Sequence, residues 1–337
     1  MSKIIEFDST NASHIDRLTE FYVGYYREYN PEDPPMPREK LQNILSTPQA
    51  GKYIKRWFLQ SDEIMASGLY SRPEKNNAEY ATSGHIGQLS IIVLPKFRGN
   101  GYSKLLLKEI IRYAKLDGIQ KFQYFASNDN ALRWSEKLGA KKGPVGGENR
   151  LKLDHVDQSL TKRWIKEGEE KNQDVKLHHF ISEIPENYLE RFCDLYTETV
   201  NEAPDEGVEY TTVLTGDDRR KDEQYWKDNN QIMHVMVTEE SNSELSGLTE
   251  VMKDQSNPFI IHQELTGVRS KFRGKGLGKW LKAKMIDYVL EAYPDAKIIS
   301  TGNADSNKPM MSINERLGFY PYHRNTICEI DLEKIPL

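Results

Sequence analysis

Hydrophobic and polar positions along this chain follow two spacings, one typical of helices and one typical of strands. Apolar residues recur at every third or fourth position and predict amphipathic helices over 14–29, 103–116, 187–200 and 278–293. Short stretches rich in branched and aromatic residues predict strands at 3–7, 53–60, 64–70, 86–94, 121–127, 175–181, 232–238, 248–252, 262–268 and 297–301. Because strands alternate with helices, we expect an α/β or α+β fold built in layers, and not a helix bundle.

The same order of elements occurs twice. A glycine-rich turn reads KFRGNGYSKLL at 96–106 and KFRGKGLGKWL at 271–281, and each copy stands between a predicted strand and a predicted helix. Each copy then continues through a strand into a second helix that ends in Leu-Gly, within EKLGA at 136–140 and ERLGF at 315–319. A duplicated domain explains both this order and the nearly constant spacing between the copies.

The chain length and the stretch between the copies agree with two domains. At 337 residues the chain exceeds the size of one typical core and is long enough for two. We therefore expect an N-terminal domain at 1–157 and a C-terminal domain at 175–337, joined by a linker at 158–174. Trp164 and its apolar neighbours have helical spacing, which predicts a docked linker helix with a flexible end at 168–174.

Composition and charge narrow the class of function. With 37% hydrophobic and 29% charged residues, the chain has a globular composition, and it contains no apolar run of the roughly 18 residues that a membrane span needs. Its start has no charged head followed by an apolar stretch, so we expect no membrane partner and a cytoplasmic location. A net charge of −5 disfavours nucleic-acid binding and is compatible with a cationic acceptor. Cys193 and Cys328 have no CxxC motif or histidine cluster near them, so we expect buried thiols and no metal.

The glycine-rich turn is the first candidate binding site. Between a strand and a helix, such a turn lets several backbone N–H groups converge on an anion, and the helix dipole adds positive potential there. Its glycines permit positive φ angles and let a phosphate approach the backbone closely. A solubilising surface turn with basic residues would look similar, but its recurrence at the same junction favours anion binding.

At this point the sequence resembles the GNAT acetyltransferases, whose signature is Arg or Gln, two residues, Gly, one residue, and then Gly or Ala. Arg273, Gly276 and Gly278 fit it fully, and the first copy fits with Ser103 in the final small position. The resemblance implies a mixed, splayed sheet flanked by helices in each domain, and a loop that holds the pyrophosphate of acetyl-CoA. The cofactor-binding residues it implies are Thr266, Val268, Arg273, Gly274, Lys275, Gly276, Leu277, Gly278, Lys279, Asn303 and Asn307 in the second copy, and Val93, Arg98, Gly99, Asn100, Gly101, Ser103 and Asn128 in the first.

The second copy resembles the family more fully than the first. Its segment TGNADSNKPMMSINERLGF at 301–319 is similar to the ending of many bacterial GNAT proteins, and TGV precedes the turn. Asn307 stands before Lys308 and Pro309, which is also a good helix N-cap, so capping and cofactor contact are both expected there. Two fused copies are similar to tandem acetyltransferases of the mycothiol synthase type, a resemblance that does not identify the acceptor.

Acetyl transfer to an amine needs a general base, which contributes about 10²- to 10⁴-fold to the rate. In histone acetyltransferases and mycothiol synthase a glutamate stands six residues before the valine of the cofactor strand, and here that position is His262. A histidine can accept a proton near neutral pH, although one near a strand start is often a surface residue. Glu264 shares its strand face in a regular strand and could orient or replace it, and Glu250 on the neighbouring strand is a third candidate. In the first copy the same position is Gly87, so the catalytic role falls to the second copy.

The proton donor for the leaving thiolate is not evident from the sequence. Many GNAT enzymes place a tyrosine seven residues after the helix-starting asparagine, but this chain has Asn314 there in the second copy and Ser135 in the first. Solvent, or another tyrosine such as Tyr320, could supply this proton. Acidic residues around Pro204 could face a cationic acceptor or form an exposed loop.

We therefore expect an N-acetyltransferase that moves acetyl from acetyl-CoA to a primary amine of a small molecule. The C-terminal domain would do the chemistry, and the N-terminal domain would be degenerate, either as a scaffold or as a second cofactor-binding domain. The alternatives are a non-catalytic acyl-CoA-binding or sensory protein, and an acetyltransferase that acts on a protein amine. A monomer is compatible with this reading, because the two domains could pair within one chain.

Overall fold

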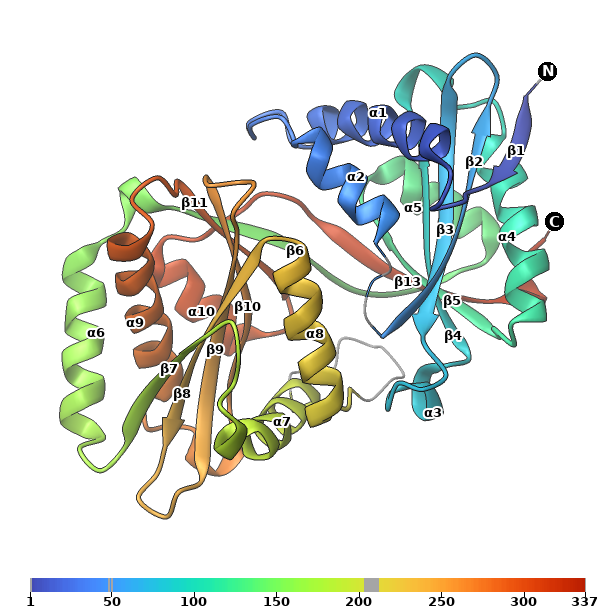
Figure 1. The fold of residues 1–337 in the computed structure, drawn as a ribbon. Helices are drawn as coiled ribbons and strands as arrows, with labels where there is room; N and C mark the ends of the chain where they lie inside the picture. The colour runs from blue at the N-terminus through green and yellow to red at the C-terminus, as the bar shows by residue number, and fades with distance from the viewer. Residues whose placement is uncertain (1, 48, 50, 203–211, 337) are drawn as a thin grey trace. The chain divides into compact units, whose positions relative to one another are not determined.

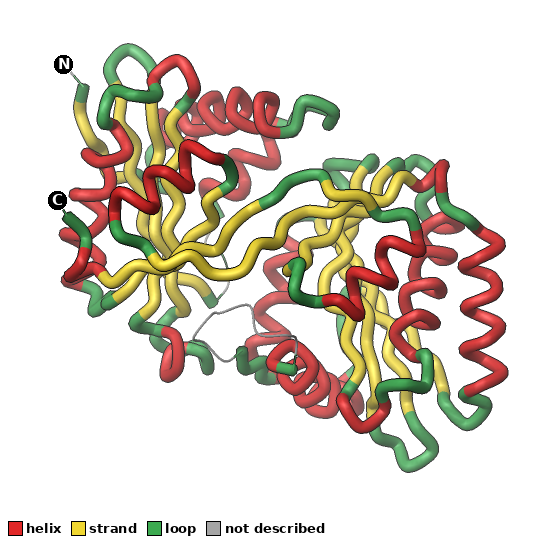
Figure 2. Tube along the Cα trace, turned by 180° about the vertical axis from the view of Figure 1, so that it is seen from behind, coloured by secondary structure: helices red, strands yellow, loops and turns green. Residues whose placement is uncertain are grey.

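The computed structural model describes residues 2–47, 49, 51–202 and 212–336. The acidic residues around Pro204 fall outside this part of the chain. Two compact units form, one from Met1–Gly143 with Thr326–Leu337 and the other from Pro144–Asn325. We call them unit 1 and unit 2, and each is a mixed sheet with helices on both faces (Figures 1 and 2). The expected α/β fold with two similar domains is confirmed.

The sheet of unit 1 has the strand order β1-β2-β3-β4-β5-β13. Neighbouring strands in this sheet are antiparallel, except for β4 and β5, which are parallel. The strands are β1 Lys3–Glu6, β2 Lys52–Gln60, β3 Ile64–Pro73, β4 Ile86–Val93, β5 Lys121–Ala126 and β13 Asn325–Asp331. The helices are α1 Ala12–Tyr29, α2 Arg38–Ser46, α3 Tyr80–Ser83, α4 Tyr102–Leu116 and α5 Asp129–Leu138.

Alternation along the strands of unit 1 builds a core on each face of the sheet. In β2, Trp57 and Leu59 join the core that contains Leu107 of α4, whereas Phe58 joins the core that contains Leu18 of α1. Successive side chains of a strand point to opposite faces, so one strand supplies both cores. The hairpin expected from the two apolar stretches at 53–60 and 64–70 is the β2–β3 pair.

The sheet of unit 2 has the order β6-β11-β10-β9-β8-β7, and the short β12 also pairs with β6. Only β10 and β11 are parallel. The strands are β6 Lys141–Lys152, β7 Lys176–Ile181, β8 Gln231–Glu239, β9 Leu245–Asp254, β10 Ile260–Val268, β11 Ile298–Ala304 and β12 Tyr320–Pro321. The helices are α6 Gln158–Lys171, α7 Glu186–Asn201, α8 Gly216–Asp228, α9 Leu277–Ala292 and α10 Lys308–Leu317.

The helices of unit 2 cover the two faces of its sheet. Val235 and Val237 of β8 pack in the core beneath α7, whereas Met236 packs with Leu281 of α9 on the other side. Helix α8 packs on β8, a position that apolar spacing alone did not predict, because this helix is largely polar. Its sequence signals are the Thr215 N-cap and the acidic first turn.

The compact units divide the chain differently from the boundaries expected at 157 and 175. Strand β13 lies near the end of the chain, yet it pairs with β5 in unit 1, with Cys328 opposite Tyr124. From Pro144 onward β6 belongs to unit 2, where Leu151 pairs with Ile299 of β11. Each of these strands covers an edge that would otherwise expose unpaired N–H and C=O groups. A sequence repeat cannot show with which copy a strand pairs.

The expected linker at 158–174 is mostly the helix α6, which packs on α9 within unit 2. Trp164 is buried in the same core as Leu281, so the predicted docking by this tryptophan is confirmed. The expected flexible end is instead held by hydrogen bonds. Lys171 Nζ donates to the carbonyl oxygen of Gly274 at 2.9 Å, and Asn172 Nδ2 donates to that of Lys275 at 3.3 Å. The segment between the repeats therefore supports the second glycine-rich turn.

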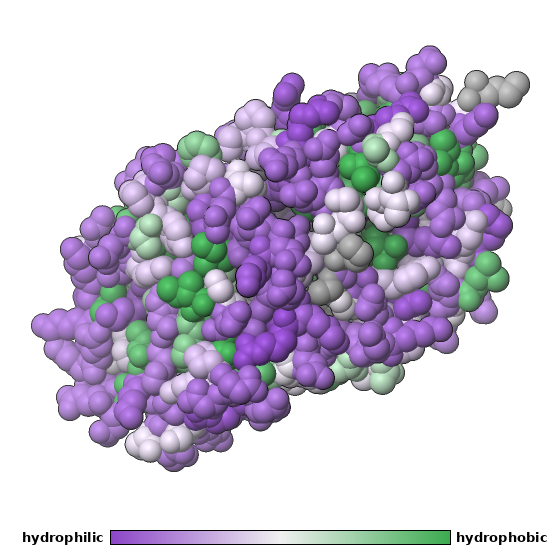
Figure 3. All heavy atoms as spheres, in the orientation of Figure 1, coloured by the Kyte–Doolittle hydropathy of each residue, from purple (hydrophilic) through white to green (hydrophobic). Residues whose placement is uncertain are grey.

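Among the described residues, no helix combines the length and the hydrophobicity that a membrane crossing would require, and no cluster of metal-ligating side chains forms. Cys193 and Cys328 are buried free thiols. On the face drawn in Figure 3, hydrophilic residues predominate and apolar ones form small separate patches.

Candidate active site

The two parallel strands of unit 2 separate part-way along their length. Strand β10 pairs with β11 only from Ile260 to Gln263, opposite Ile298 to Thr301. Beyond this point β10 continues to Val268 beside β9 alone, while β11 continues beside β6. Among the described residues, the second half of β10 therefore has no strand partner on its β11 side, where an extended ligand can pair with its backbone. Unit 1 repeats this splay, because β4 pairs with β5 only from Ile86 to Gln88.

A β-bulge lies at the point where the strands separate. The register of β10 against β9 shifts between Gln263 and Thr266, so that one extra residue is accommodated there. The buried Gln263 holds the bulge, because its Nε2 donates to the carbonyl oxygen of Glu250 at 2.6 Å and to Thr249 Oγ1 at 3.1 Å. Thr249 and Thr266 also join through their hydroxyl groups at 2.8 Å. Glu264 and Leu265 fall in the shifted part, opposite the one residue Glu250 of β9, whereas His262 pairs with Met252 before it.

The glycine-rich turn connects β10 to α9. Gly274 and Gly276 have φ angles of 82° and 85°, in the left-handed region that favours glycine. Gly276 is the N-cap of α9, and no side chain in the described part of the chain caps that end. The first N–H groups of the helix are therefore available to an anion, and the helix dipole favours negative charge there. Arg273 Nε donates to the carbonyl oxygen of Val268 at 3.0 Å, which closes the turn.

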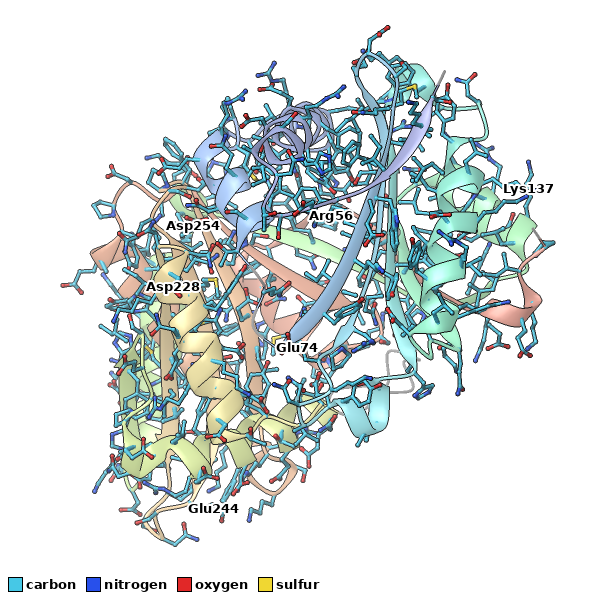
Figure 4. All side chains as sticks on the ribbon, turned by 45° about the vertical axis from the view of Figure 1, so that its right-hand side comes forward. Arg56, Glu74, Lys137, Asp228, Glu244 and Asp254 are labelled. Carbon is cyan, nitrogen blue, oxygen red and sulfur yellow. The ribbon has the colours of Figure 1, made fainter. Side chains whose placement is uncertain are left out.

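Acidic side chains hold the basic residues around this turn. Arg273 pairs with Glu202 at 2.9 Å, and Lys275 pairs with Glu240 at 3.0 Å. Glu244, labelled in Figure 4 at the β8–β9 turn, pairs with Arg269 at 2.8 Å. These ion pairs are partly exposed, so they orient the turn more than they stabilise the fold.

One groove of about 1430 Å³ extends from this turn along the free edge of β10, and all of its lining residues belong to unit 2. Its volume exceeds the roughly 300–1,000 Å³ of an ordinary small-molecule pocket, which leaves room for two substrates. Parts of α6, α7, β11 and α10 form its other walls. Every cofactor residue predicted in the second copy lines it: Thr266, Val268, Arg273, Gly274, Lys275, Gly276, Leu277, Gly278, Lys279, Asn303 and Asn307.

The three candidate bases occupy different environments. Glu264 lines the groove, where its side chain is open to solvent but enclosed by protein on its other sides. This enclosure, and then the charge of Glu250, raise the pKa of Glu264. Glu250 is 2% exposed and is not among the lining residues. His262 is half-buried in the paired part of β10 and does not line the groove either.

Glu250 belongs to a buried network of charges behind the groove. Arg219 of α8 donates to Glu250 Oε1 at 3.1 Å and to Glu223 Oε1 at 3.3 Å. Glu223 Oε1 also accepts from the backbone N–H of Ile184 at 2.9 Å. Burial raises the pKa of Glu250 and the Arg219 charge opposes that effect. This network was not predicted from the sequence, because the role of Arg219 depends on where α8 packs.

At the other side of the splay, polar groups of α9, α10 and β11 form a chain of hydrogen bonds. Lys282 Nζ donates to Asn314 Oδ1, and Asn314 Nδ2 donates to Asn303 Oδ1 at 2.6 Å. Lys282 was not predicted, although a lysine beside Met285 and Ile286 on the apolar face of α9 was a signal in the sequence. Asn307 caps α10 as expected, accepting from the N–H of Met310 at 3.2 Å. Tyr320 pairs in β12 and does not line the groove.

Unit 1 keeps the geometry of the turn. Gly99 and Gly101 have φ angles of 83° and 78°, and Arg98 Nε donates to the carbonyl oxygen of Val93 at 3.1 Å. Asn100 Nδ2 donates to the carbonyl oxygen of Phe97 at 3.0 Å. Ser103 lies in the first turn of α4, and Asn128 caps α5 by accepting from the N–H of Ala131 at 2.9 Å.

Comparison with known families identifies the fold. The model of the family described as "Acetyltransferase (GNAT) family" matches residues 15–140 and 192–319, which together exceed half of the chain. The chain belongs to the GNAT acetyltransferase family. Both copies of the repeat are matched, so the chain is a tandem GNAT protein. The family generally uses acetyl-CoA, and membership supports acyl-CoA-dependent acetyl transfer as the class of activity.

Solved structures show the same tandem fold. A tandem GNAT protein from the clavulanic acid biosynthesis pathway, determined without AcCoA, has a TM-score of 0.79 at 17% identity, over 98% of this chain and 99% of that one. A GCN5-related N-acetyltransferase from Sphaerobacter thermophilus has a TM-score of 0.68 at 14% identity, over 99% and 96%. A GCN5-related glucosamine N-acetyltransferase region of a fungal multi-domain β-N-acetylglucosaminidase has a TM-score of 0.70 at 10% identity, over 98% and 38%. No curated protein matches the sequence.

Proposed function

We propose that this GNAT protein transfers an acetyl group from acetyl-CoA to a primary amine of a small molecule, with the chemistry in unit 2. The observation that carries the proposal is the single groove that joins the open N-terminus of α9, the free edge of β10 and Glu264. These are, in order, an anion site, a backbone edge for an extended ligand and a carboxylate at its end. Acetyl-CoA, when bound, supplies the activated acyl group as a thioester.

The residues around the turn fit a pyrophosphate. The N–H groups between Gly274 and Gly278 and the first turn of α9 would hold its oxygens, since no side chain caps that helix. An added Cβ at Gly274 or Gly276 would meet no atom within 4 Å, so the space in front of the turn is open to a ligand. Lys279, Asn303 and Thr266 would line the rest of the path.

Glu264 is the base that we assign to the reaction. Of the three candidates, it alone lines the groove. Its raised pKa makes it a better proton acceptor than an ordinary surface carboxylate, because a base works best when its pKa lies near the operating pH. Glu264 would take a proton from the attacking amine, directly or through one water molecule. Glu250, held by Arg219, would act as the neighbouring charge that tunes it.

The roles of the two units and of the acceptor belong to the same proposal. A cationic amine fits the carboxylate of Glu264 in the groove, and a small acceptor fits the volume left beside the cofactor path. Unit 1 would serve as a scaffold or as a second cofactor-binding domain, because it keeps Arg98 and both glycines of its turn. We also propose that the protein acts as a monomer in the cytoplasm.

Calorimetric titration of acetyl-CoA into wild type, Gly276→Asp and Gly101→Asp tests the cofactor site. Aspartate tolerates a positive φ angle better than most residues, and it places a negative charge where the pyrophosphate would lie. We expect Gly276→Asp to weaken binding at least about tenfold, a change of about 1.4 kcal/mol. Binding that survives in Gly276→Asp and disappears in Gly101→Asp would move the chemistry to unit 1. Absence of binding in wild type would end the proposal.

Release of free thiol in the presence of a panel of small amines then tests the transfer. A rate that rises for at least one amine, and falls in Gly276→Asp, supports the assignment. Tight binding without thiol release for any amine, peptide amines included, would favour the non-catalytic acyl-CoA-binding alternative.

A further inference from the structure

Lys282 is a buried lysine on the wall of the groove. Lys282 lies in the middle of α9 and is 1% exposed, and it lines the groove together with Thr301 and Asn303. Burying an ammonium group is costly unless something interacts with it, so residues of this type are rarely found in a core by chance. Lys282 stands beside the point where β10 and β11 separate, since Thr301 is the last residue of β11 paired with β10.

The ammonium group of Lys282 is oriented from two sides. Nζ donates to Asn314 Oδ1, while the ring of Phe319 lies with its centroid 5.1 Å from Nζ. Asn314 is itself fixed, because its amide donates to Asn303 at 2.6 Å. An ammonium has three N–H donors, so it can hold Asn314 and still direct a proton into the groove. Asn314 also occupies the position at which many GNAT enzymes carry a tyrosine acid.

The duplicated domain shows that the fold does not require a lysine here. At the matching position of α4 stands Leu107, which is 1% exposed and packs in the main core of unit 1. The residue that matches Asn314 is Ser135, which is also buried. The same helix packing is thus reached with an apolar side chain. The lysine and its amide partner occur only in the unit whose groove has Glu264.

We propose that Lys282 is the general acid of the acetyl transfer, and that its ammonium group donates a proton to the sulfur of coenzyme A. The inference rests on the proposed function. The amine nitrogen forms a bond to the carbonyl carbon and gives a proton to Glu264, and the carbon–sulfur bond breaks with its electron pair left on sulfur. Lys282 supplies the proton that this sulfur takes up and becomes a neutral amine, which regains a proton from solvent, while Glu264 releases its proton to solvent.

The acid–base properties of the site agree with this role. Burial lowers the pKa of Lys282 to about 7, so it can lose and regain a proton near neutral pH. The other charged side chains that line the same groove are Glu167, Glu170, Lys171, Glu202, Glu264, Arg273, Lys275, Lys279 and Arg316. The cause of the lowered pKa is burial, and not repulsion by these groups.

The test compares wild type with Lys282→Met, and uses Lys284→Met as the matched control. Lys284 lies on the same helix, partly exposed, and pairs with Glu169 at 3.0 Å. The first readout needs no acceptor: coenzyme A is bound and its thiolate is followed by ultraviolet absorbance as the pH rises. Because Lys282 and the thiol would titrate as a coupled pair, thiolate should appear in wild type and in Lys284→Met about 1 pH unit or more below the pH at which it appears in free coenzyme A. In Lys282→Met the thiol should titrate as it does in free coenzyme A.

The second readout uses any amine that wild type acetylates. We expect Lys282→Met to lose about 10²- to 10⁴-fold in kcat, with acetyl-CoA affinity changed by less than about threefold. In wild type, kcat/KM should fall above neutral pH as the lysine loses its proton. This fall should be absent in Lys282→Met. If Lys282→Met folds poorly, Asn314→Ser keeps the lysine but removes its partner, and it should alter the pH at which this fall occurs.

Two results would overturn the inference about Lys282. One is a bound thiol that titrates at the same pH in wild type and Lys282→Met, and the other is an unchanged alkaline limb in both Lys282→Met and Asn314→Ser. Either result leaves the proposed acetyl transfer intact, as long as wild type binds acetyl-CoA and releases thiol. If wild type binds no acetyl-CoA, it is the proposed function that fails.

Discussion

Arg273 Nε and the carbonyl oxygen of Val268 lie 3.0 Å apart, and the matching atoms of Arg98 and Val93 lie 3.1 Å apart. In both copies the signature arginine therefore folds back on the strand that precedes it. Since the bond spans five residues, it fixes the exit from the strand and the turn that follows. The arginine thus shapes the anion site from behind, and both units have kept this arrangement.

Replacing Arg273 with alanine should weaken acetyl-CoA binding without unfolding the protein. The bond to Val268 and the ion pair with Glu202 are both partly exposed, so their loss costs little stability. Without the hydrogen bond to Val268 the turn would be held less firmly. We therefore expect the dissociation constant of acetyl-CoA to rise about tenfold, a change of about 1.4 kcal/mol. Calorimetry on Arg273→Ala and on its counterpart Arg98→Ala measures this directly. An equal loss in both variants would show that both units bind the cofactor.

Replacing Glu264 with glutamine should lower the rate of transfer and leave cofactor binding unchanged. Glu264 acts as a base only when ionised, and its pKa is raised by its enclosure and by Glu250. In wild type the rate of transfer should therefore increase as the pH rises through that raised pKa. Glu264→Gln should lack this increase, and its rate should be about 10²- to 10⁴-fold lower.

The matched control for this prediction is Glu183→Gln, which changes an exposed carboxylate in the loop after β7. It should keep both the rate and the pH profile. His262→Asn distinguishes the competing candidate. If His262→Asn loses this increase with pH and Glu264→Gln keeps it, the base is the histidine.

Replacing Arg219 with methionine should destabilise unit 2 strongly. Arg219 pairs with Glu250 and Glu223 inside the protein, and its removal leaves two buried carboxylates without that charge. Breaking a buried ion pair from one side typically costs about 3–5 kcal/mol. Urea unfolding should show a loss of that size for Arg219→Met and almost none for Lys221→Met, whose side chain is 47% exposed. Equal stability of the two variants would mean that the network is not needed for folding.

Stability should fall in mild acid because of a buried histidine in unit 2. His234 contacts His179 at 3.3 Å and also bonds the hydroxyl of Tyr293. Burial, and then His179, lower the pKa of His234 to about 4. Because this lies below the ordinary value of about 6.5, the unfolded chain binds a proton that the folded one does not. The contribution is fully present above about pH 6.5 and is lost as the pH falls toward 4, by roughly 3 kcal/mol at most.

Urea unfolding at a series of pH values between about 4 and 7 tests this effect. His234→Gln should flatten the pH dependence, whereas His155→Gln, which changes an exposed side chain, should leave it as in wild type. The same slope in all three proteins would contradict the assignment to His234.

Much of the cofactor site was predictable from sequence because it is local. The positive φ angles of the turn, its place between a strand and a helix, and the N-cap formed by Asn307 depend on residues within a few positions of each other. The resemblance to GNAT proteins then named the groove residues of the second copy, and all of these line one groove. The resemblance also implied a splayed sheet in each domain, and the parallel strands of both units separate in this way.

The assignment of the catalytic groups was harder, because it depends on contacts between distant segments. The end of the β10–β11 pairing leaves His262 in the paired part of β10 and Glu264 beyond it, which a count of residues along β10 could not show. Arg219 meets Glu250 only because α8 packs on the sheet. Lys282 was visible as a lysine on an apolar helix face, but its link to Asn314 required α9 and α10 to be placed together.

By itself, the sequence determined a duplicated α/β domain, the family and the two glycine-rich turns, since periodicity, glycine conformation and helix capping are properties of short segments. Only the tertiary structure decided that β13 belongs to the sheet of unit 1 and that β6 pairs with β11 in unit 2. It also decided that Glu264, and not His262, lines the groove. Hydrogen bonds between strands and the burial of charge involve residues far apart in the chain. A local sequence pattern does not determine which distant residue each of these residues contacts.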